Sequence, residues 1–81
     1  MQQVHDKVLD ILADVTGTDA VRGDPSLLLF DSGLLDSLGT VTLMAAFEEA
    51  LGVAISPAAF DREDWSTPAR MVADLERRCA R

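Results

Sequence analysis

The chain has 81 residues, with 14 acidic side chains against 7 basic ones, a net charge of −7 and 48% hydrophobic residues. This length allows one hydrophobic core and argues against a self-contained enzyme with a deep cleft between lobes. We therefore expect a single domain over residues 1–81. Because the nucleic-acid backbone repels carboxylates, the acidic charge predicts no nucleic-acid binding and favours basic partner proteins.

Cys79 is the only cysteine, which excludes an internal disulfide framework and a cysteine-rich zinc site. No apolar run approaches the ~18 residues of a membrane span, and the first ten residues interleave polar and apolar side chains, unlike a signal peptide. We therefore expect a cytoplasmic monomer that is neither secreted nor inserted in a membrane, with its fold resting on the apolar core.

The first helix is predicted over Gln2–Thr16, with Gly17 as its stop signal. Its apolar residues recur at the spacing of one helical face, at Val4, Val8, Ile11, Leu12 and Val15. From residue 17 to residue 35 this period disappears, and glycine, aspartate, serine and proline surround an apolar island at 27–30. The pattern predicts a long loop pinned to the core, and loops of this length are often functional.

The clearest helix is predicted to begin after Asp36, a favoured N-cap residue, and to run to Leu51 before Gly52. At about 100° per residue, one side faces the core and carries Leu43, Met44, Phe47, Ala50 and Leu51. The opposite side carries an apolar strip with an acidic rim, formed by Leu38, Val41, Ala45, Glu48 and Glu49. Such a strip facing away from the core predicts a docking surface for basic partners.

Two further start signals follow, Ser56-Pro57 and Thr67-Pro68, each a cap residue followed by proline. The first predicts a short helical segment near 58–61. The second predicts a last helix with one apolar stripe and arginines near its end, where cations favour the helix dipole. No strand alternation appears, so the predicted fold is an all-α bundle of three main helices plus a short one.

Catalytic and metal-binding residues are not evident. His5 is the only histidine and lies at the start of the first helix, where a solvated surface position is expected. Serine-hydrolase, P-loop and zinc-protease spacings do not occur. The acidic run Asp61, Glu63 and Asp64 is predicted to be solvated, so we expect no metal site.

Ser37 is the residue to which the remaining signals point. Asp36 caps the helix, which places the Ser37 side chain in the exposed first turn, beside unpaired backbone N–H groups and the positive end of the dipole. A phosphate attached to Ser37 would be stabilised there. The alternative is that Asp36 and Ser37 are simply favourable helix-start residues. Ser32 is a weaker candidate because Gly33 follows it and no apolar helix begins there.

Nearly the whole chain resembles the acyl and peptidyl carrier family, which depends on phosphopantetheine. The resemblance rests on the acidic composition, the long first loop, the Asp-Ser-Leu triplet at 36–38 and the amphipathic helix that ends in EEALGV at 48–53. It implies a carrier-like helical bundle in which a separate phosphopantetheinyl transferase attaches 4′-phosphopantetheine to Ser37. The chain would be a non-catalytic carrier that holds its cargo as a thioester.

A narrower resemblance comes from LFDSGLLDS at 29–37 and FDREDWSTP at 60–68, which look like the D-alanyl carrier proteins of teichoic acid modification. In this comparison Trp65 would pack onto the core. The small residues Gly39, Ala45 and Ala46 depart from that subgroup, so the first interpretation is a discrete carrier of an amino acid in natural-product biosynthesis. D-alanyl transfer to teichoic acid is the alternative.

The resemblance implies three kinds of partner: the phosphopantetheinyl transferase, an adenylating ligase that loads the arm, and an acyltransferase or synthetase that unloads it. Cys79 is not the thiol of the arm, since it lies on the apolar stripe of the last helix. A competing hypothesis is an all-α interaction module that binds a basic partner through residues 38–49 without any cofactor.

Overall fold

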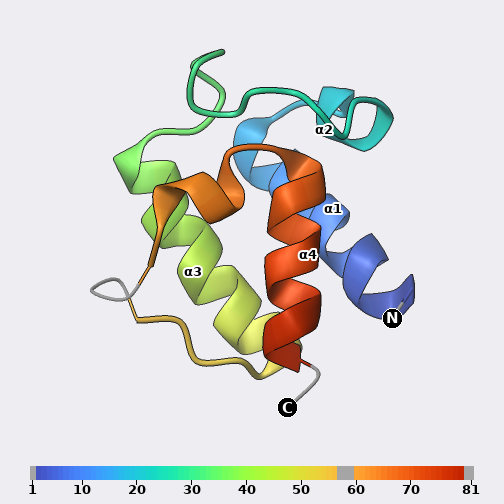
Figure 1. Cartoon of the computed structure of the whole chain (residues 1–81), viewed down its shortest axis with the longest axis vertical. Helices are drawn as coiled ribbons and strands as arrows, with labels where there is room; N and C mark the ends of the chain where they lie inside the picture. Colours follow the sequence, from blue (N-terminus) through green and yellow to red (C-terminus); the bar gives the residue numbers. More distant parts are fainter. Residues whose placement is uncertain (1, 57–59, 80–81) are drawn as a thin grey trace.

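A computed structural model describes residues 2–56 and 60–79, with the side chain of residue 2 left aside, as five helical segments. Three long helices, α1 (Gln2–Thr16), α3 (Ser37–Leu51) and α4 (Pro68–Cys79), form the bundle (Figure 1). α1 packs against both α3 and α4. The all-α prediction is confirmed, α1 and α3 have the predicted bounds, and α4 begins at Pro68, where the Thr67-Pro68 signal predicted a helix start.

The ends of α1 and α3 follow the expected chemistry of helix termini. Gly17 and Gly52 have φ values of +76° and +69°, a left-handed conformation that glycine adopts without steric cost. The N–H of Gly17 donates to the carbonyl of Ala13 at 2.8 Å, and that of Gly52 donates to the carbonyl of Glu48 at 3.0 Å. These bonds satisfy carbonyl groups that the helix itself leaves without partners.

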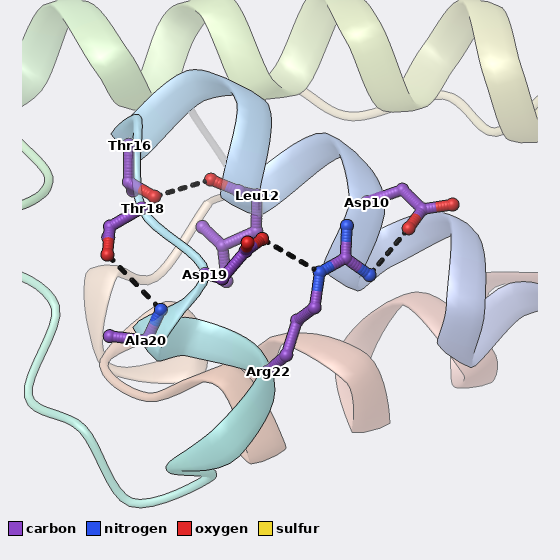
Figure 2. Close-up of polar contacts among 7 residues, drawn as sticks. All are labelled: Asp10, Leu12, Thr16, Thr18, Asp19, Ala20 and Arg22. Atoms are coloured by element: carbon purple, nitrogen blue, oxygen red, sulfur yellow. Dashed lines mark hydrogen bonds and ion pairs between the residues drawn. The ribbon is translucent and has the colours of Figure 1, made fainter.

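Residues 17–36 contain one turn of helix that the sequence did not predict, α2 (Ala20–Gly23). The hydroxyl of Thr18 accepts from the N–H of Ala20 at 3.2 Å, and Arg22 forms ion pairs with Asp19 and, across to α1, with Asp10 at 2.6 Å (Figure 2). Val21 is buried. A single turn is too short to show a helical period in the sequence, so the pattern of residues 17–35 predicts only a loop.

The rest of this connection is anchored to the bundle as predicted. Leu29 is fully buried, and its N–H donates to the carbonyl of Ser66 at 2.9 Å. Leu35 is also buried, and its N–H donates to the carbonyl of Leu29. The loop therefore passes from α2 to the beginning of α3 along a fixed path.

The short helix before α4 begins later than predicted. It is a 3-10 turn, η1 (Arg62–Trp65), capped by the Asp61 carboxylate, which accepts from the N–H of Glu63 at 3.0 Å. Residues 57–59 of the predicted segment lie outside the described residues, whereas residues 60 and 61 are not helical. The aspartate at 61 caps the turn, so the turn must follow it.

The core contains Trp65 as its largest fully buried side chain. Phe47 and Phe60 meet its ring edge-on, at centroid distances of 5.5 and 4.7 Å. Its indole N–H donates to the buried carboxylate of Asp74 at 2.9 Å. The predicted packing of Trp65 onto the core is therefore confirmed.

The buried face of α3 is rotated slightly from the predicted one. Leu43, Met44 and Phe47 are buried as expected, but Leu51 is only half-buried and Ala50 is exposed. Thr40 is buried instead. At about 100° per residue Thr40 lies between Leu43 and Met44, so the buried arc is centred there and leaves Ala50 outside its edge. The placement of Ala50 in the core was therefore wrong.

Candidate functional site

The first turn of α3 is built on Asp36. Its backbone is extended, and its carboxylate accepts from the N–H of Gly39 at 2.8 Å. Its carbonyl accepts from both the N–H and the hydroxyl of Thr40, at 2.9 and 2.7 Å. The second of these bonds satisfies the one polar atom of the buried Thr40 side chain. Asp36 is thus the N-cap of α3, as predicted, and its bonds set the direction in which the helix begins.

Gly39 leaves room for this cap. A Cβ atom at this position would lie 3.1 Å from Cδ1 of Leu35 and 3.3 Å from the Asp36 carboxylate oxygen. Both distances are shorter than ordinary van der Waals contact. A larger residue would therefore push on the cap and on the buried Leu35, which gives a structural reason for the small residue.

Ser37 is the first residue of α3, and its side chain is exposed. The N–H groups of Ser37 and Leu38 precede the first intrahelical bond, which runs from Thr40 to Asp36, so they have no acceptor within the helix. They lie at the positive end of the dipole. An accessible hydroxyl beside such donors is chemically suited to carry a phosphate ester.

Ser32 differs from Ser37 in its surroundings. It lies in a turn, its N–H donates to the carbonyl of Leu28 at 2.9 Å, and its hydroxyl donates to the carbonyl of Leu29 at 3.3 Å. No helix begins after it, and Gly33 has a φ of +83°. Its hydroxyl is therefore engaged in the loop rather than presented at a helix end.

A cavity of about 230 Å³ opens beside Ser37. Its walls come from the loop before α3, from α3 itself and from the segment that leads into η1, and they comprise Phe30, Ser37, Thr40, Phe60 and Arg62. The Arg62 guanidinium lies over the Phe30 ring, 4.2 Å from its centroid. This cavity could not be predicted from the sequence, because its walls come from two parts of the chain, residues 30–40 and 60–62, that meet only in the fold.

The outer face of α3 is exposed as predicted. Leu38 and Val41 have exposed fractions of 76% and 57%, and Ala45 and Glu49 are also exposed. Glu48 is exposed too, but its carboxylate accepts from the N–H of Ile55 at 2.9 Å. It therefore has a structural bond that the sequence did not predict.

Other chemistry is not evident in the part of the chain that the structure describes. His5 lies exposed on α1. Among residues 2–56 and 60–79, no group of three or more histidine, cysteine, aspartate or glutamate side chains could hold a metal ion. No helix within these residues is long and apolar enough to cross a membrane.

Comparison with known proteins gives a family. A family model described as "Phosphopantetheine attachment site" matches residues 6–75. The chain belongs to this family of carrier proteins. It is accordingly a non-catalytic carrier with a covalent 4′-phosphopantetheine, which a phosphopantetheinyl transferase attaches. The exposed hydroxyl and first-turn N–H groups of α3 fit this group, since they can carry and solvate its phosphate.

Several curated carriers are similar over most of their length. The D-alanyl carrier protein of Lacticaseibacillus rhamnosus is 44% identical over 75 residues, 93% of each chain. That of Enterococcus faecalis is 44% identical over 73 residues, 90% of this carrier and 94% of the relative. That of Bacillus velezensis is 45% identical over 69 residues, 85% and 88% of the two chains. The narrower resemblance seen at residues 29–37 and 60–68 thus agrees with the full alignments.

Proposed function

We propose that this chain is an aminoacyl carrier for D-alanine, that it forms one domain over residues 1–81, and that its phosphopantetheine arm is attached to Ser37. The support for the cargo is the shared name of relatives that are 44% identical over nine-tenths of the chain. These relatives favour the D-alanyl alternative over a natural-product pathway. In this proposal the D-alanine is then transferred to teichoic acid.

One observation carries the choice of Ser37. It is an exposed serine in the first turn of a capped helix, and the adjacent outer face of that helix is apolar and exposed at Leu38 and Val41. The attachment point and the candidate docking surface therefore lie side by side, so an enzyme bound to α3 would meet the arm at its base. Ser32 lacks this arrangement.

In this proposal the residues at the beginning of α3 and on its outer face have three different roles. Asp36 orients the first turn, Ser37 holds the arm, and the partners dock on Leu38, Val41, Ala45, Glu48 and Glu49. When bound, the arm supplies a terminal thiol on which an acyl group is held as a thioester. The docking enzymes are the transferase, an adenylating ligase that loads the thiol and an acyltransferase that removes the cargo.

Attachment is tested by coexpression with a broad-specificity phosphopantetheinyl transferase and by intact-protein mass. Wild type and Ser32→Ala should gain the mass of one arm, whereas Ser37→Ala should gain none. Circular dichroism of Ser37→Ala should match wild type, because the exposed hydroxyl makes no packing contact that folding requires. A modified Ser37→Ala protein, or a wild type that gains no mass, would overturn the assignment.

The cargo is tested on the modified carrier. It is incubated with ATP, a D-alanine-activating ligase and D-alanine, L-alanine or glycine, and loading is followed by mass. D-alanine should be loaded fastest, and hydroxylamine should release it from the arm, because hydroxylamine cleaves thioesters. Equal loading of all three amino acids, or none with a ligase active on another D-alanyl carrier, would contradict the D-alanine proposal while leaving the carrier role intact.

A further inference from the structure

The cavity beside Ser37 combines an exposed attachment point with two aromatic rings and a cation. Phe30 and Phe60 contribute the rings, and Arg62 contributes the charge. Ser37 and Arg62 line this cavity together, although they are 25 positions apart in the sequence. The site is therefore made by the fold, by bringing η1 against the beginning of α3.

The walls of this cavity are held from behind by the core. Phe60 meets the fully buried Trp65 ring at 4.7 Å, and the indole of Trp65 is hydrogen-bonded to Asp74. On the other wall, the carbonyl of Phe30 accepts from the N–H of Gly33 at 3.1 Å. Phe30 and Phe60 are both partly buried against the hydrophobic core, which favours a preformed contact surface.

Arg62 is placed on the Phe30 ring and not on a carboxylate. Its guanidinium lies 4.2 Å above the ring centroid, a cation–π arrangement that leaves the edge N–H donors free to bind another group. Within residues 2–56 and 60–79, no ion pair joins Arg62 to an acidic side chain, whereas Arg22, Arg77 and Arg78 are each paired. Its charge is therefore available to a ligand.

An arm on Ser37 would bring a phosphodiester, with one negative charge, to the surface of a chain whose net charge is already −7. The neighbouring Asp36 carboxylate would repel it. A guanidinium is the side chain best matched to phosphate oxygens, because its planar N–H donors can bind two of them at once. The cavity supplies such a group beside the attachment point.

We propose that Arg62 binds the phosphodiester of the arm attached to Ser37, while Phe30 and Phe60 contact the methyl groups that follow the phosphate. This inference rests on the proposed attachment at Ser37. It makes η1 part of the cofactor site and directs the base of the arm toward Arg62, leaving the distal thiol end free for partner enzymes.

The first test compares the apo and modified forms of the wild-type chain, and substitutions serve only for assignment and as a control. Arginine Nε–Hε signals are recorded by ¹⁵N NMR for the apo and modified forms of the wild-type chain, assigned with Arg62→Lys and Arg70→Lys. The signal of Arg62 should shift on modification, and that of Arg70, on the exposed surface of α4, should not. In the Ser37→Ala protein treated with the transferase, the Arg62 signal should not shift, because no arm is attached.

A second test follows the phosphorus itself. The ³¹P signal of the phosphodiester in the folded, modified chain should move toward that of the same modified chain unfolded in urea in Arg62→Gln, move less in Arg62→Lys, and stay in place in Arg70→Gln. Added salt should reduce the difference between the ³¹P shifts of the wild type and Arg62→Gln, because salt screens an exposed ion pair. Circular dichroism checks that each variant is folded.

The outcomes separate the two proposals. A chain that gains no arm, or gains it at another residue, contradicts the proposed function. A chain fully modified at Ser37 whose Arg62 signal is unchanged, and whose ³¹P signal is the same in wild type and Arg62→Gln, overturns only the role of Arg62. Equal effects at Arg62 and Arg70 would also overturn it, because they would indicate a general charge effect.

Discussion

The two faces of α3 carry apolar side chains of similar size in opposite surroundings. Leu43 and Phe47 on the inner face are fully buried, whereas Leu38 and Val41 on the outer face are mostly exposed. Burial of a side chain such as leucine or phenylalanine contributes about 1.5–3 kcal/mol to folding. Leu38 and Val41 gain much less of this in the isolated chain, which supports the proposal that their apolar surface contacts other proteins.

The first prediction tests the inner face. Phe47→Ala removes a ring that is fully buried and packed edge-on against Trp65, so it should lower the free energy of unfolding by about 3–5 kcal/mol. This is a large part of a small domain's stability. Thermal melting followed by circular dichroism provides the measurement, with Leu38→Ala as the matched outer-face control, expected within about 0.5 kcal/mol of wild type. Similar melting of both variants would remove the distinction between the faces.

The second prediction concerns Asp74 on α4, whose carboxylate is buried and accepts from the indole N–H of Trp65. Burial alone would raise the pKa of Asp74, but hydrogen bonds from Arg78, Trp65 and Arg77 lower it overall. Asp74→Ala leaves the indole N–H of Trp65 without its acceptor and should cost about 1–3 kcal/mol at pH 7.

The pH dependence of that cost follows from the direction of the pKa shift. Since the folded-state pKa is lowered, ionised Asp74 stabilises the fold above the unfolded-state pKa, and this contribution is lost as the pH falls below about 4. Calorimetry from pH 7 to pH 3 should therefore show the difference between wild type and Asp74→Ala becoming smaller. A constant difference would show that the charge of Asp74 is not what stabilises the fold.

The third prediction separates two neighbouring glutamates at the edge of the outer face. Glu48→Ala removes the acceptor of the Ile55 N–H and should lower the free energy of unfolding by about 1 kcal/mol. Glu49→Ala removes the same kind of side chain from the exposed face of the same helix and should change the free energy of unfolding by no more than about 0.5 kcal/mol. Urea unfolding of the two variants gives the comparison, and equal midpoints would mean that the Glu48 bond adds nothing.

The smallest stability change is expected at Val41, together with a large change in function. Val41→Asp lies on the exposed strip, so its free energy of unfolding should stay within about 0.5 kcal/mol of wild type. Its rate of loading by a cognate ligase should fall at least about tenfold, because a carboxylate would be desolvated inside the contact. Val41→Ala, which keeps the site apolar, should retain most of the rate. Unchanged loading of Val41→Asp would place docking on another surface.

The regular helices could be predicted from the sequence because their signals are local. Periodic apolar residues, the Asp36 cap and Gly52 define α1 and α3 within short windows. What could not be predicted depends on tertiary contacts. The single turn of α2 is held by an ion pair to α1, and the burial of Thr40 requires the backbone carbonyl of Asp36 to accept its hydroxyl.

The candidate site also has one part that could be predicted from local sequence and one part that depends on tertiary contacts. Ser37 and the outer strip of α3 are adjacent in sequence, so a helical wheel was enough to place them together. Arg62, Phe30 and Phe60 meet Ser37 only after the chain folds, and no pattern in the sequence links them. Asp74 was similarly missed, because a buried aspartate on an apolar stripe is recognised only from the three donors around it.

The packing of Trp65 also has a spectroscopic consequence. It is the only tryptophan in a chain without tyrosine, so excitation at long ultraviolet wavelengths reports on this one side chain. Its indole ring touches Phe60, which forms a wall of the cavity beside Ser37, while its N–H is bonded to α4. Intrinsic fluorescence therefore follows both unfolding and events at the cavity. A change in Trp65 emission when the arm is attached to the folded chain could therefore be measured without any added label.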